Sequence, residues 1–219
     1  MNRHDKEWFQ GILHGRNIIE EDADSVLTDE EDEAMDEFFR YIDALASKIK
    51  LLALDVDGVL TDGTIFIAAD GEIFKGFNAK DGMGISCALR SGIEVAIITG
   101  RHSEIVHRRA EELGIKIVLE GIRDKGEALS ELCRQLKISL NEVAYIGDDL
   151  NDLPAFSRCG FSLAPNDAAY AVSEKADWNL LADGGHGAVR EAVELILTAQ
   201  GKWENIAESY YDAGQGDRQ

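Results

Sequence analysis

Short runs of apolar residues recur along the chain, and each is followed by a polar loop and then by a stretch with helical spacing of its apolar side chains. The runs are Ile49–Leu54, Glu94–Ile98, Ile115–Leu119, Val143–Ile146 and Gly160–Ala164. A strand that is apolar throughout must be buried on both faces, as in a parallel sheet covered by helices. The alternation therefore predicts a doubly wound, Rossmann-like α/β fold with helices on both faces of a parallel sheet.

The helices are expected at Gly82–Ser91, Ser103–Leu113, Asp124–Leu136, Leu153–Cys159, Asp167–Ser173 and Ala188–Ala199. One segment breaks the alternation, because Thr64–Ala68 and Glu72–Phe77 are both β-type runs and are joined across an Asp-Gly pair. Such a pair between two β-type runs is typical of a tight hairpin turn. We expect a short β-hairpin flap at residues 64–77 in place of an inserted cap domain.

The first 48 residues differ in composition from the rest of the chain. Eleven of the eighteen residues from Glu20 to Glu37 are acidic and none is basic, so this stretch repels itself and is expected to stay solvated. Asp36–Leu45 has apolar residues at helical spacing and predicts a helix that leads into the domain. We interpret 1–48 as an acidic, partly disordered extension, more plausibly a spacer than an interaction segment. Residues 49–202 form the α/β domain and 203–219 a C-terminal tail.

The charge balance narrows the possible partners. The 219 residues carry 22 Lys and Arg against 42 Asp and Glu, a net charge of −20, which opposes binding to nucleic acids and to anionic membranes. No apolar run reaches the roughly 18 residues of a membrane span. Cys87, Cys133 and Cys159 lack the spacing of a disulfide framework or a zinc site. We expect a soluble cytoplasmic protein that holds any anionic ligand with a local cation or a bound metal.

Acidic side chains follow two of the predicted strands. Asp55 and Asp57 come directly after the first strand, and Asp148 comes after the fourth. The carboxyl ends of parallel strands meet at one edge of the sheet, where ligands bind in open α/β folds. Carboxylate oxygens suit Mg²⁺ better than a soft transition metal. The alternative is that these acids only cap turns and helices, and Thr99 and Lys125, which belong to the same edge, argue against it.

Four motifs, in their order and spacing, resemble those of the haloacid dehalogenase superfamily of phosphatases. They are DVDGVLTDG at Asp55–Gly63, TGR at Thr99–Arg101, Lys125, and GDDLND at Gly147–Asp152. The resemblance spans about residues 49–202. Within the superfamily, the strings FNAKDGMGI, GGHGAVREAVELIL and AQGKW are similar to those of the 3-deoxy-D-manno-octulosonate 8-phosphate phosphatase family.

The resemblance implies a Mg²⁺-dependent phosphatase that acts on this octulosonate phosphate, in lipopolysaccharide precursor synthesis, through an aspartyl-phosphate. Asp55 would be the nucleophile, and Asp57 would protonate the leaving sugar oxygen and then activate water. Thr99 and Lys125 would bind the phosphoryl oxygens. The metal would be held by Asp55, by Asp148 and by the main-chain carbonyl of Asp57.

The resemblance also implies where the sugar acid binds. Together with Asp57 and Lys125, the implied substrate-binding residues are Asn78, Lys80, Gly100, Arg101, Arg109 and Asn151. Many members of the family carry an arginine where this chain has Ser86, so this chain lacks one cation that could bind the substrate. The alternative for Lys80 and Arg109 is a simple solvated charge.

Several other polar and aromatic residues are expected to be structural. Asp149 and Asp152 would orient the metal ligands or the Lys125 ammonium rather than bind the metal themselves. His102, His107 and His186 lack metal-ligand spacing, and Trp178 and Trp203 are expected in the core or at an interface.

Two other functions stay open at this point. One is the same reaction on a nine-carbon acid phosphate, such as an acylneuraminate or deoxynonulosonate 9-phosphate. Arg101 favours the eight-carbon acid, because phosphatases of the nine-carbon acids often carry an acidic residue at this position. The other is a catalytically idle binding or regulatory module, against which the complete set of motif residues argues.

The flap also leads to an expectation about assembly. It is too small to cover a site unaided, and its apolar side chains need a partner. Related octulosonate phosphatases are tetramers, so the resemblance implies a homotetramer in which flaps complete neighbouring active sites.

Overall fold

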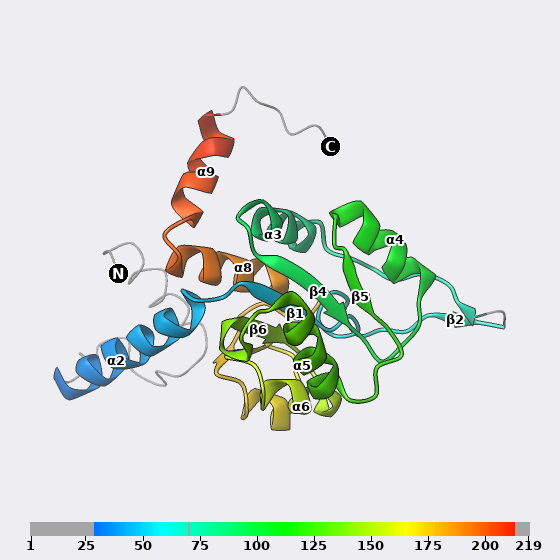
Figure 1. Cartoon of the computed structure of the whole chain (residues 1–219), viewed down its shortest axis with the longest axis horizontal. Helices are drawn as coiled ribbons and strands as arrows, with labels where there is room; N and C mark the ends of the chain where they lie inside the picture. Colours follow the sequence, from blue (N-terminus) through cyan, green and yellow to red (C-terminus); the bar gives the residue numbers. More distant parts are fainter. Residues whose placement is uncertain (1–28, 70, 213–219) are drawn as a thin grey trace, which may run out of the picture. The chain divides into compact units, whose positions relative to one another are not determined.

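The structure is a computed structural model that describes residues 29–69 and 71–212 (Figure 1). The chain divides into two compact units, Met1–Tyr41 and Ile42–Gln219. The predicted acidic extension lies outside the described residues over positions 1–28, and so does the predicted tail over positions 213–219. Helix α2 (Asp29–Ala46) begins inside the acidic run that we expected to be solvated, although Glu33 and Glu37 are exposed. Acidic side chains near a helix N-terminus interact favourably with its dipole, which the composition argument ignored.

Within the described residues, six strands form one parallel sheet. They are β1 (Leu51–Leu54), β4 (Glu94–Ile98), β5 (Ile117–Leu119), β6 (Val143–Ile146), β7 (Phe161–Ala164) and β8 (Trp178–Asn179). Their order is β5-β4-β1-β6-β7-β8, so β1 is central and pairs with β4 and β6. The first five confirm the predicted strands, with ends up to two residues shorter. Strand β8 was not predicted, since a two-residue strand gives no apolar pattern.

Helices on both faces of this sheet confirm the doubly wound fold. They are α3 (Ala79–Arg90), α4 (Glu104–Leu113), α5 (Lys125–Leu136), α6 (Leu153–Phe156), α7 (Tyr170–Ser173) and α8 (Ala188–Ala199), followed by α9 (Trp203–Asp212) in the predicted tail. Two 3₁₀ turns, η1 (Leu140–Glu142) and η2 (Leu150–Asp152), flank β6. In Figure 1, α3 and α8 lie on one side of the sheet and α5 and α6 on the other. No helix of the described residues has the length and hydropathy to cross a membrane.

Helix α3 begins three residues before the predicted start. Asn78 is its N-cap and accepts a hydrogen bond from the Lys80 backbone N–H at 2.8 Å. The two glycines of this segment, Gly82 and Gly84, both lie inside the helix. A Cβ atom added at Gly84 would lie 3.0 Å from the Cα atom of Arg190. The glycine therefore lets α8 approach α3 closely, and tertiary packing outweighs helix propensity.

The predicted flap is present, with a shorter ladder than its two apolar runs suggested. Strand β2 (Ile67–Ala68) pairs antiparallel with β3 (Gly71–Glu72), and the Ile73 N–H donates to the Phe66 carbonyl at 2.9 Å. Figure 1 shows this hairpin extending away from the parallel sheet. We use the word flap for residues 64–77 throughout.

Two loops distant in sequence support each other at the carboxyl edge of the sheet. The loop that precedes α8 packs on the loop that follows β1, and the Gly185 N–H donates to the Val59 carbonyl at 2.9 Å. A Cβ atom added at Gly184 would lie 1.9 Å from the Gly58 carbonyl oxygen. The same loop is tied to α3, because the buried Asp81 carboxylate accepts from the Gly187 N–H at 3.2 Å, as it does from the Arg190 N–H of α8 at 2.8 Å. The loop after β1 thus has a fixed backbone path.

We expect Gly184→Ala to lower the free energy of unfolding by about 1–3 kcal/mol, the usual cost of forcing an extra methyl group into a packed site. Urea unfolding measures the change. Gly76→Ala is the matched control, because nothing lies within 4 Å of a Cβ atom at Gly76, and it should change stability by less than about 0.5 kcal/mol. Equal effects of the two substitutions would contradict the close approach of the two loops.

Candidate active site

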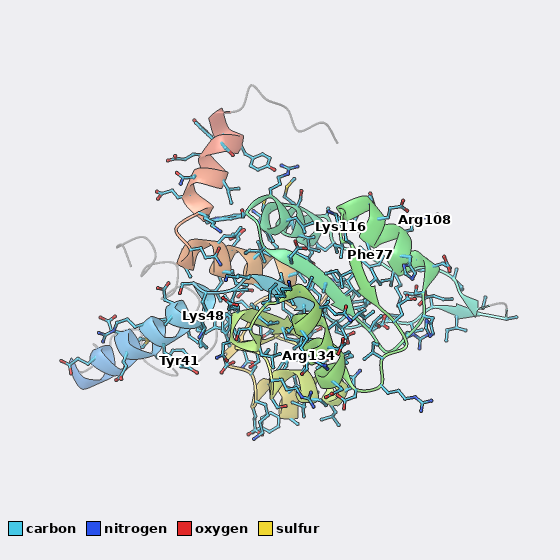
Figure 2. The ribbon with its side chains drawn as sticks, in the orientation of Figure 1. Tyr41, Lys48, Phe77, Arg108, Lys116 and Arg134 are labelled. Carbon is cyan, nitrogen blue, oxygen red and sulfur yellow. The ribbon has the colours of Figure 1, made fainter. Side chains whose placement is uncertain are left out.

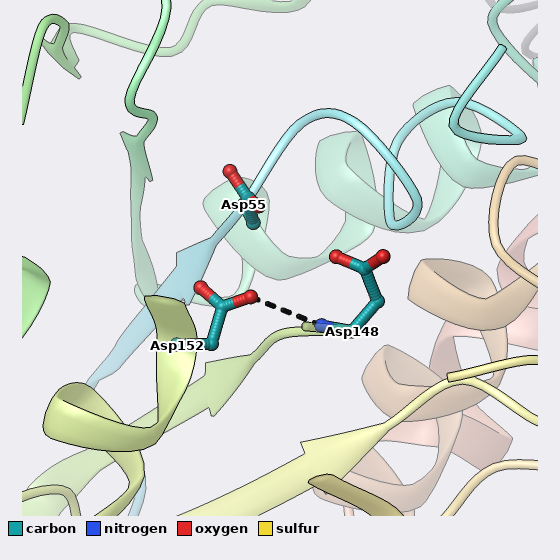
Figure 3. A group of neighbouring side chains, drawn as sticks. All are labelled: Asp55, Asp148 and Asp152. Atoms are coloured by element: carbon teal, nitrogen blue, oxygen red, sulfur yellow. Dashed lines mark hydrogen bonds between the residues drawn. The ribbon is translucent and has the colours of Figure 1, made fainter. Parts of the chain in front are cut away.

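Three carboxylates meet at the carboxyl ends of β1 and β6. Asp55 directly follows β1, Asp148 follows β6 after one glycine, and Asp152 ends η2 (Figure 3). One oxygen from each of the three lies within 4.8 Å of the others. The sheet order runs outward from β1 in both directions, so these strands flank the switch point where open α/β sheets bind ligands.

The Lys125 ammonium is buried between two of these carboxylates. Its Nζ atom lies 2.8 Å from Asp55 Oδ2 and donates to Asp152 Oδ1 at 2.7 Å. Asp152 Oδ1 also accepts from the Tyr145 hydroxyl at 2.8 Å, and Asp152 Oδ2 accepts from the Asp148 N–H at 3.1 Å. Asp152 therefore orients the lysine and the loop after β6, which is the role that the sequence analysis expected for it.

Burial and mutual repulsion raise the pKa of the two carboxyls at the strand ends. Burial first, and the Asp152 charge second, raise the pKa of Asp55 to about 6, against the opposing effect of Lys125. Burial, followed by the charges of Asp55 and Asp152, raises the pKa of Asp148 to about 7. Burial lowers the pKa of Lys125, but the two neighbouring carboxylates outweigh it and hold the pKa above its usual value. Negative charge accumulates here beyond what one ammonium neutralises.

A hard cation fits this excess of carboxylate oxygen. Asp148 Oδ1 is buried and has no hydrogen-bond partner among residues 29–69 and 71–212, which is costly for a carboxylate oxygen unless a cation binds it. A Cβ atom at Gly58 would lie 2.0 Å from Asp148 Oδ2, so the glycine leaves room for this side chain. The donors are all oxygens, the ligand type that Mg²⁺ prefers.

Thr99 lies at the end of β4 on the same edge and is buried. Its hydroxyl accepts from the Arg101 N–H at 3.4 Å. Thr99 does not cap the next helix, because Ser103 is the N-cap of α4 and accepts from the Val106 N–H at 3.3 Å. The Thr99 side chain therefore belongs to the strand-end loop that holds Arg101.

Asp57 contacts a residue that the sequence analysis missed. The Lys75 ammonium, from the flap, donates to Asp57 Oδ1 and lies 3.0 Å from Glu72 Oε1. On the other side, Arg101 Nε lies 3.7 Å from Asp57 Oδ2. Glu72 in turn accepts from the Ser103 hydroxyl. Burial raises the pKa of Glu72, but the hydrogen bonds from Ser103 and Lys75 outweigh it and hold the pKa below its usual value.

The implied substrate-binding residues are more dispersed. Arg101 is beside Asp57, whereas Lys80, Gly100 and Asn151 are exposed without a contact to the acidic cluster in the described residues. The side-chain oxygen Oδ1 of Asn78 caps the N-terminus of α3.

Arg109 is not brought to the acidic cluster of its own chain. It pairs with Glu112 at 2.8 Å, and its guanidinium lies 5.8 Å from the centre of the ring of Phe77, a residue labelled in Figure 2. A Cβ atom at Gly82 would lie 2.5 Å from Arg109 Nη2, so the guanidinium also packs on α3.

The residues expected to be structural have structural contacts. His102 and His107 both face Glu120 Oε2, at 3.4 and 2.9 Å, and His186 Nδ1 lies 2.8 Å from the Gly184 carbonyl. Trp178 is buried, and the Arg190 guanidinium lies 4.8 Å from the centre of the Trp203 ring. Asp149 accepts from the Leu150 N–H at the start of η2, at 2.7 Å.

Comparison with known proteins gives a consistent result. Residues 117–190 match the haloacid dehalogenase-like hydrolase family. The 3-deoxy-D-manno-octulosonate 8-phosphate phosphatase KdsC of Escherichia coli (strain K12) is 49% identical over 159 residues, which cover 73% of this chain and 85% of that protein. The enzyme of the same name from Haemophilus influenzae is 44% identical over 168 residues, covering 77% and 91%.

A solved structure extends the similarity to the fold. The crystal structure of the 3-deoxy-D-manno-octulosonate 8-phosphate phosphatase from Moraxella catarrhalis, in complex with a magnesium ion, a phosphate ion and a KDO molecule, superimposes with a TM-score of 0.76. That chain is 43% identical, and the match covers 78% of this chain and 98% of that one. With this fold, these strand-end carboxylates and this identity, the chain belongs to the 3-deoxy-D-manno-octulosonate 8-phosphate phosphatase family of haloacid dehalogenase-like hydrolases.

Proposed function

We propose that this protein hydrolyses 3-deoxy-D-manno-octulosonate 8-phosphate to the free sugar acid and phosphate, a step toward lipopolysaccharide. The observation that carries the proposal is the buried Asp55–Lys125–Asp152 arrangement beside Asp148, in a chain 49% identical to a phosphatase of that name. An idle binding module would have no use for a buried ammonium held between two carboxylates, which is costly to desolvate.

The nucleophile in this proposal is Asp55. With a pKa of about 6, the carboxyl is mostly ionised at neutral pH, as an attack on phosphorus requires. Attack gives an aspartyl-phosphate and releases the sugar oxygen, to which Asp57 delivers a proton. Asp57 then takes a proton from the water that cleaves the aspartyl-phosphate. Lys125 and the Thr99 hydroxyl hold the phosphoryl oxygens as their charge changes.

We assign Mg²⁺ to Asp55, Asp148 and the main-chain carbonyl of Asp57. When bound, the ion neutralises the repulsion between the attacking carboxylate and the phosphoryl oxygens. The support for this assignment is the partnerless Asp148 Oδ1 and the raised pKa of both strand-end carboxyls.

Arg101 is the candidate partner of the substrate carboxylate among the residues near Asp57. Its planar guanidinium binds both oxygens of a carboxylate. It is half-exposed, so a ligand can reach it. Asn78, Lys80, Gly100 and Asn151 border the same edge, and Arg109 faces away from it, toward α3.

Phosphate release over a panel of sugar phosphates tests the function. We expect turnover of the octulosonate 8-phosphate in preference to the nine-carbon acylneuraminate 9-phosphate. Asp55→Asn should lower kcat by at least about a thousandfold, since an amide is a poor nucleophile.

The matched control is Asp43→Asn, the same change at an exposed position of α2, and it should keep wild-type activity. Preference for the nine-carbon substrate would reassign the substrate, and more than a few per cent residual activity in Asp55→Asn would refute the nucleophile.

Metal binding is expected to depend on pH. Asp55 and Asp148, with pKa values of about 6 and about 7, bind protons more tightly in the folded protein than in the unfolded chain. Without metal, the folded protein therefore loses stability as the pH rises from about 4 toward 7. Mg²⁺ binds the ionised carboxylates, so added MgCl₂ should raise the thermal midpoint more at about pH 8 than at about pH 5.5. At a Mg²⁺ concentration of a hundred times Kd, binding raises the free energy of unfolding by about 2.7 kcal/mol, which raises the thermal midpoint by roughly 5–10 °C.

Asp148→Asn should lose most of this increase. Asp149→Asn, the same change one residue further on, should keep it, because an asparagine oxygen still accepts from the Leu150 N–H. A midpoint that responds to MgCl₂ equally at both pH values would contradict a site made of these carboxylates.

We further propose that the flaps of neighbouring chains pack together in a homotetramer. Five large apolar side chains of the flap are exposed, and the rings of Phe66 and Phe74 stack at 4.1 Å between centroids. The exposed set is Ile65, Phe66, Ile67, Ile73 and Phe74. Apolar surface of this kind on a small hairpin favours association with a second copy.

Sedimentation equilibrium is expected to give four times the 24.1 kDa chain mass. Phe66→Ser with Phe74→Ser should dissociate the assembly and lower activity. Mixing these subunits with Asp55→Asn subunits should restore part of the activity. In mixed assemblies, the intact flap of an Asp55→Asn chain can cover the active site of a chain that keeps Asp55. A fully active monomer would rule out the proposal.

A further inference from the structure

We propose that Lys75 is a positioning residue that makes the flap part of the catalytic geometry by holding the Asp57 carboxylate. The inference rests on the proposed function, in which Asp57 is the acid. Lys75 belongs to none of the sequence motifs. It is 18 positions from Asp57, so no local pattern links the two residues.

Lys75 is buried although it belongs to a projecting hairpin. Its side chain is 2% exposed, and its ammonium lies between Asp57 Oδ1 and Glu72 Oε1, the latter at 3.0 Å. A solvated lysine on a hairpin would extend into water. Among the described residues, the two carboxylates compensate the burial of this charge, so the lysine is held where both can reach it.

The second carboxylate anchors the lysine to another loop of the site. Glu72 accepts from the hydroxyl of Ser103, and Ser103 is the N-cap of α4, four residues after Thr99. The chain of contacts therefore runs from the strand-end loop of β4, through Glu72 and Lys75 of the flap, to the loop after β1. The flap is attached to the active site of its own chain through Glu72 and Lys75, while Ile73 and Phe74, between these two residues, stay exposed.

The contact fixes one oxygen of Asp57. Lys75 holds Oδ1, and Oδ2 lies 3.7 Å from Arg101 Nε, a distance too long for a direct hydrogen bond. Oδ2 is thus the oxygen left to face the leaving group. A general acid must reach the leaving oxygen within hydrogen-bond distance, and a displacement of about 1 Å lowers the rate about a hundredfold. The ion pair supplies this placement.

Two other roles for Lys75 make different predictions. A lysine that only stabilises the flap would affect all substrates alike. A lysine that binds the substrate directly would change KM. A lysine that acts through the acid matters only where the leaving group needs a proton, as an alkoxide does and p-nitrophenolate does not.

The experiment compares Lys75→Met and Lys75→Arg with wild type on the best sugar-acid phosphate of the panel and on p-nitrophenyl phosphate. The parameter is kcat/KM, which covers the steps up to release of the leaving group. We expect Lys75→Met to lose about ten- to a hundredfold on the sugar-acid phosphate and less than about threefold on p-nitrophenyl phosphate. Lys75→Arg should recover most of the loss. Lys116→Met, at an exposed lysine labelled in Figure 2, should change neither substrate.

A double variant closes the test. In an Asp57→Asn background, Lys75→Met should cost less than about twofold more on the sugar-acid phosphate, because the lysine has no acid left to position. Additive losses, equal losses on both substrates, or a rise in KM with unchanged kcat would each overturn the proposal. A wild-type protein that hydrolyses none of the sugar-acid phosphates would instead refute the proposed function, and that outcome is visible before any variant is made.

Discussion

The buried contact between Lys125 and the carboxylates of Asp55 and Asp152 is the constraint on which the active site depends. It joins the ends of β1 and η2 to the first residue of α5, so three elements must be in place before the charges are compensated. The cost of burying these charges is met only by the complete set, and loss of any one leaves an unpaired charge in the interior. The carboxyl ends of the strands are therefore fixed by electrostatics as well as by packing.

The flap adds a second network of the same kind around Asp57. Lys75 and Glu72 belong to its second strand segment, and Ser103 is the N-cap of α4, so the proposed acid is fixed from outside the parallel sheet. The side chains of Asp55 and Asp57 are therefore held by different cations, Lys125 and Lys75, although only one residue separates them. A division of this kind suits two adjacent carboxyls that are proposed to have different roles, one as nucleophile and one as acid and base.

Sequence reasoning found what local patterns determine and missed what distant packing determines. Asp55 and Asp148 were placed because an apolar strand and its polar end are adjacent in the chain. The start of α3 was predicted three residues too late, since its first turn is held by a contact with a distant segment, the Asp81 carboxylate accepting from the Arg190 N–H of α8. Lys75 was missed for the same reason, as its ion pair with Asp57 forms only when the flap folds back.

The net charge of −20 opposes binding of a sugar-acid phosphate, yet the site holds two buried ammonium groups, those of Lys75 and Lys125. Lys75 and Lys125 each lie between two carboxylates, so protein oxygens already compensate the cost of removing water from their ammonium groups. In the proposed reaction, substrate oxygens replace or join those carboxylates around charges that are already buried, and little further water needs to be removed. Preorganised charges of this kind act at low reorganisation cost in a water-poor site. An acidic protein can thus bind an anion through a few cations that its own acids have placed.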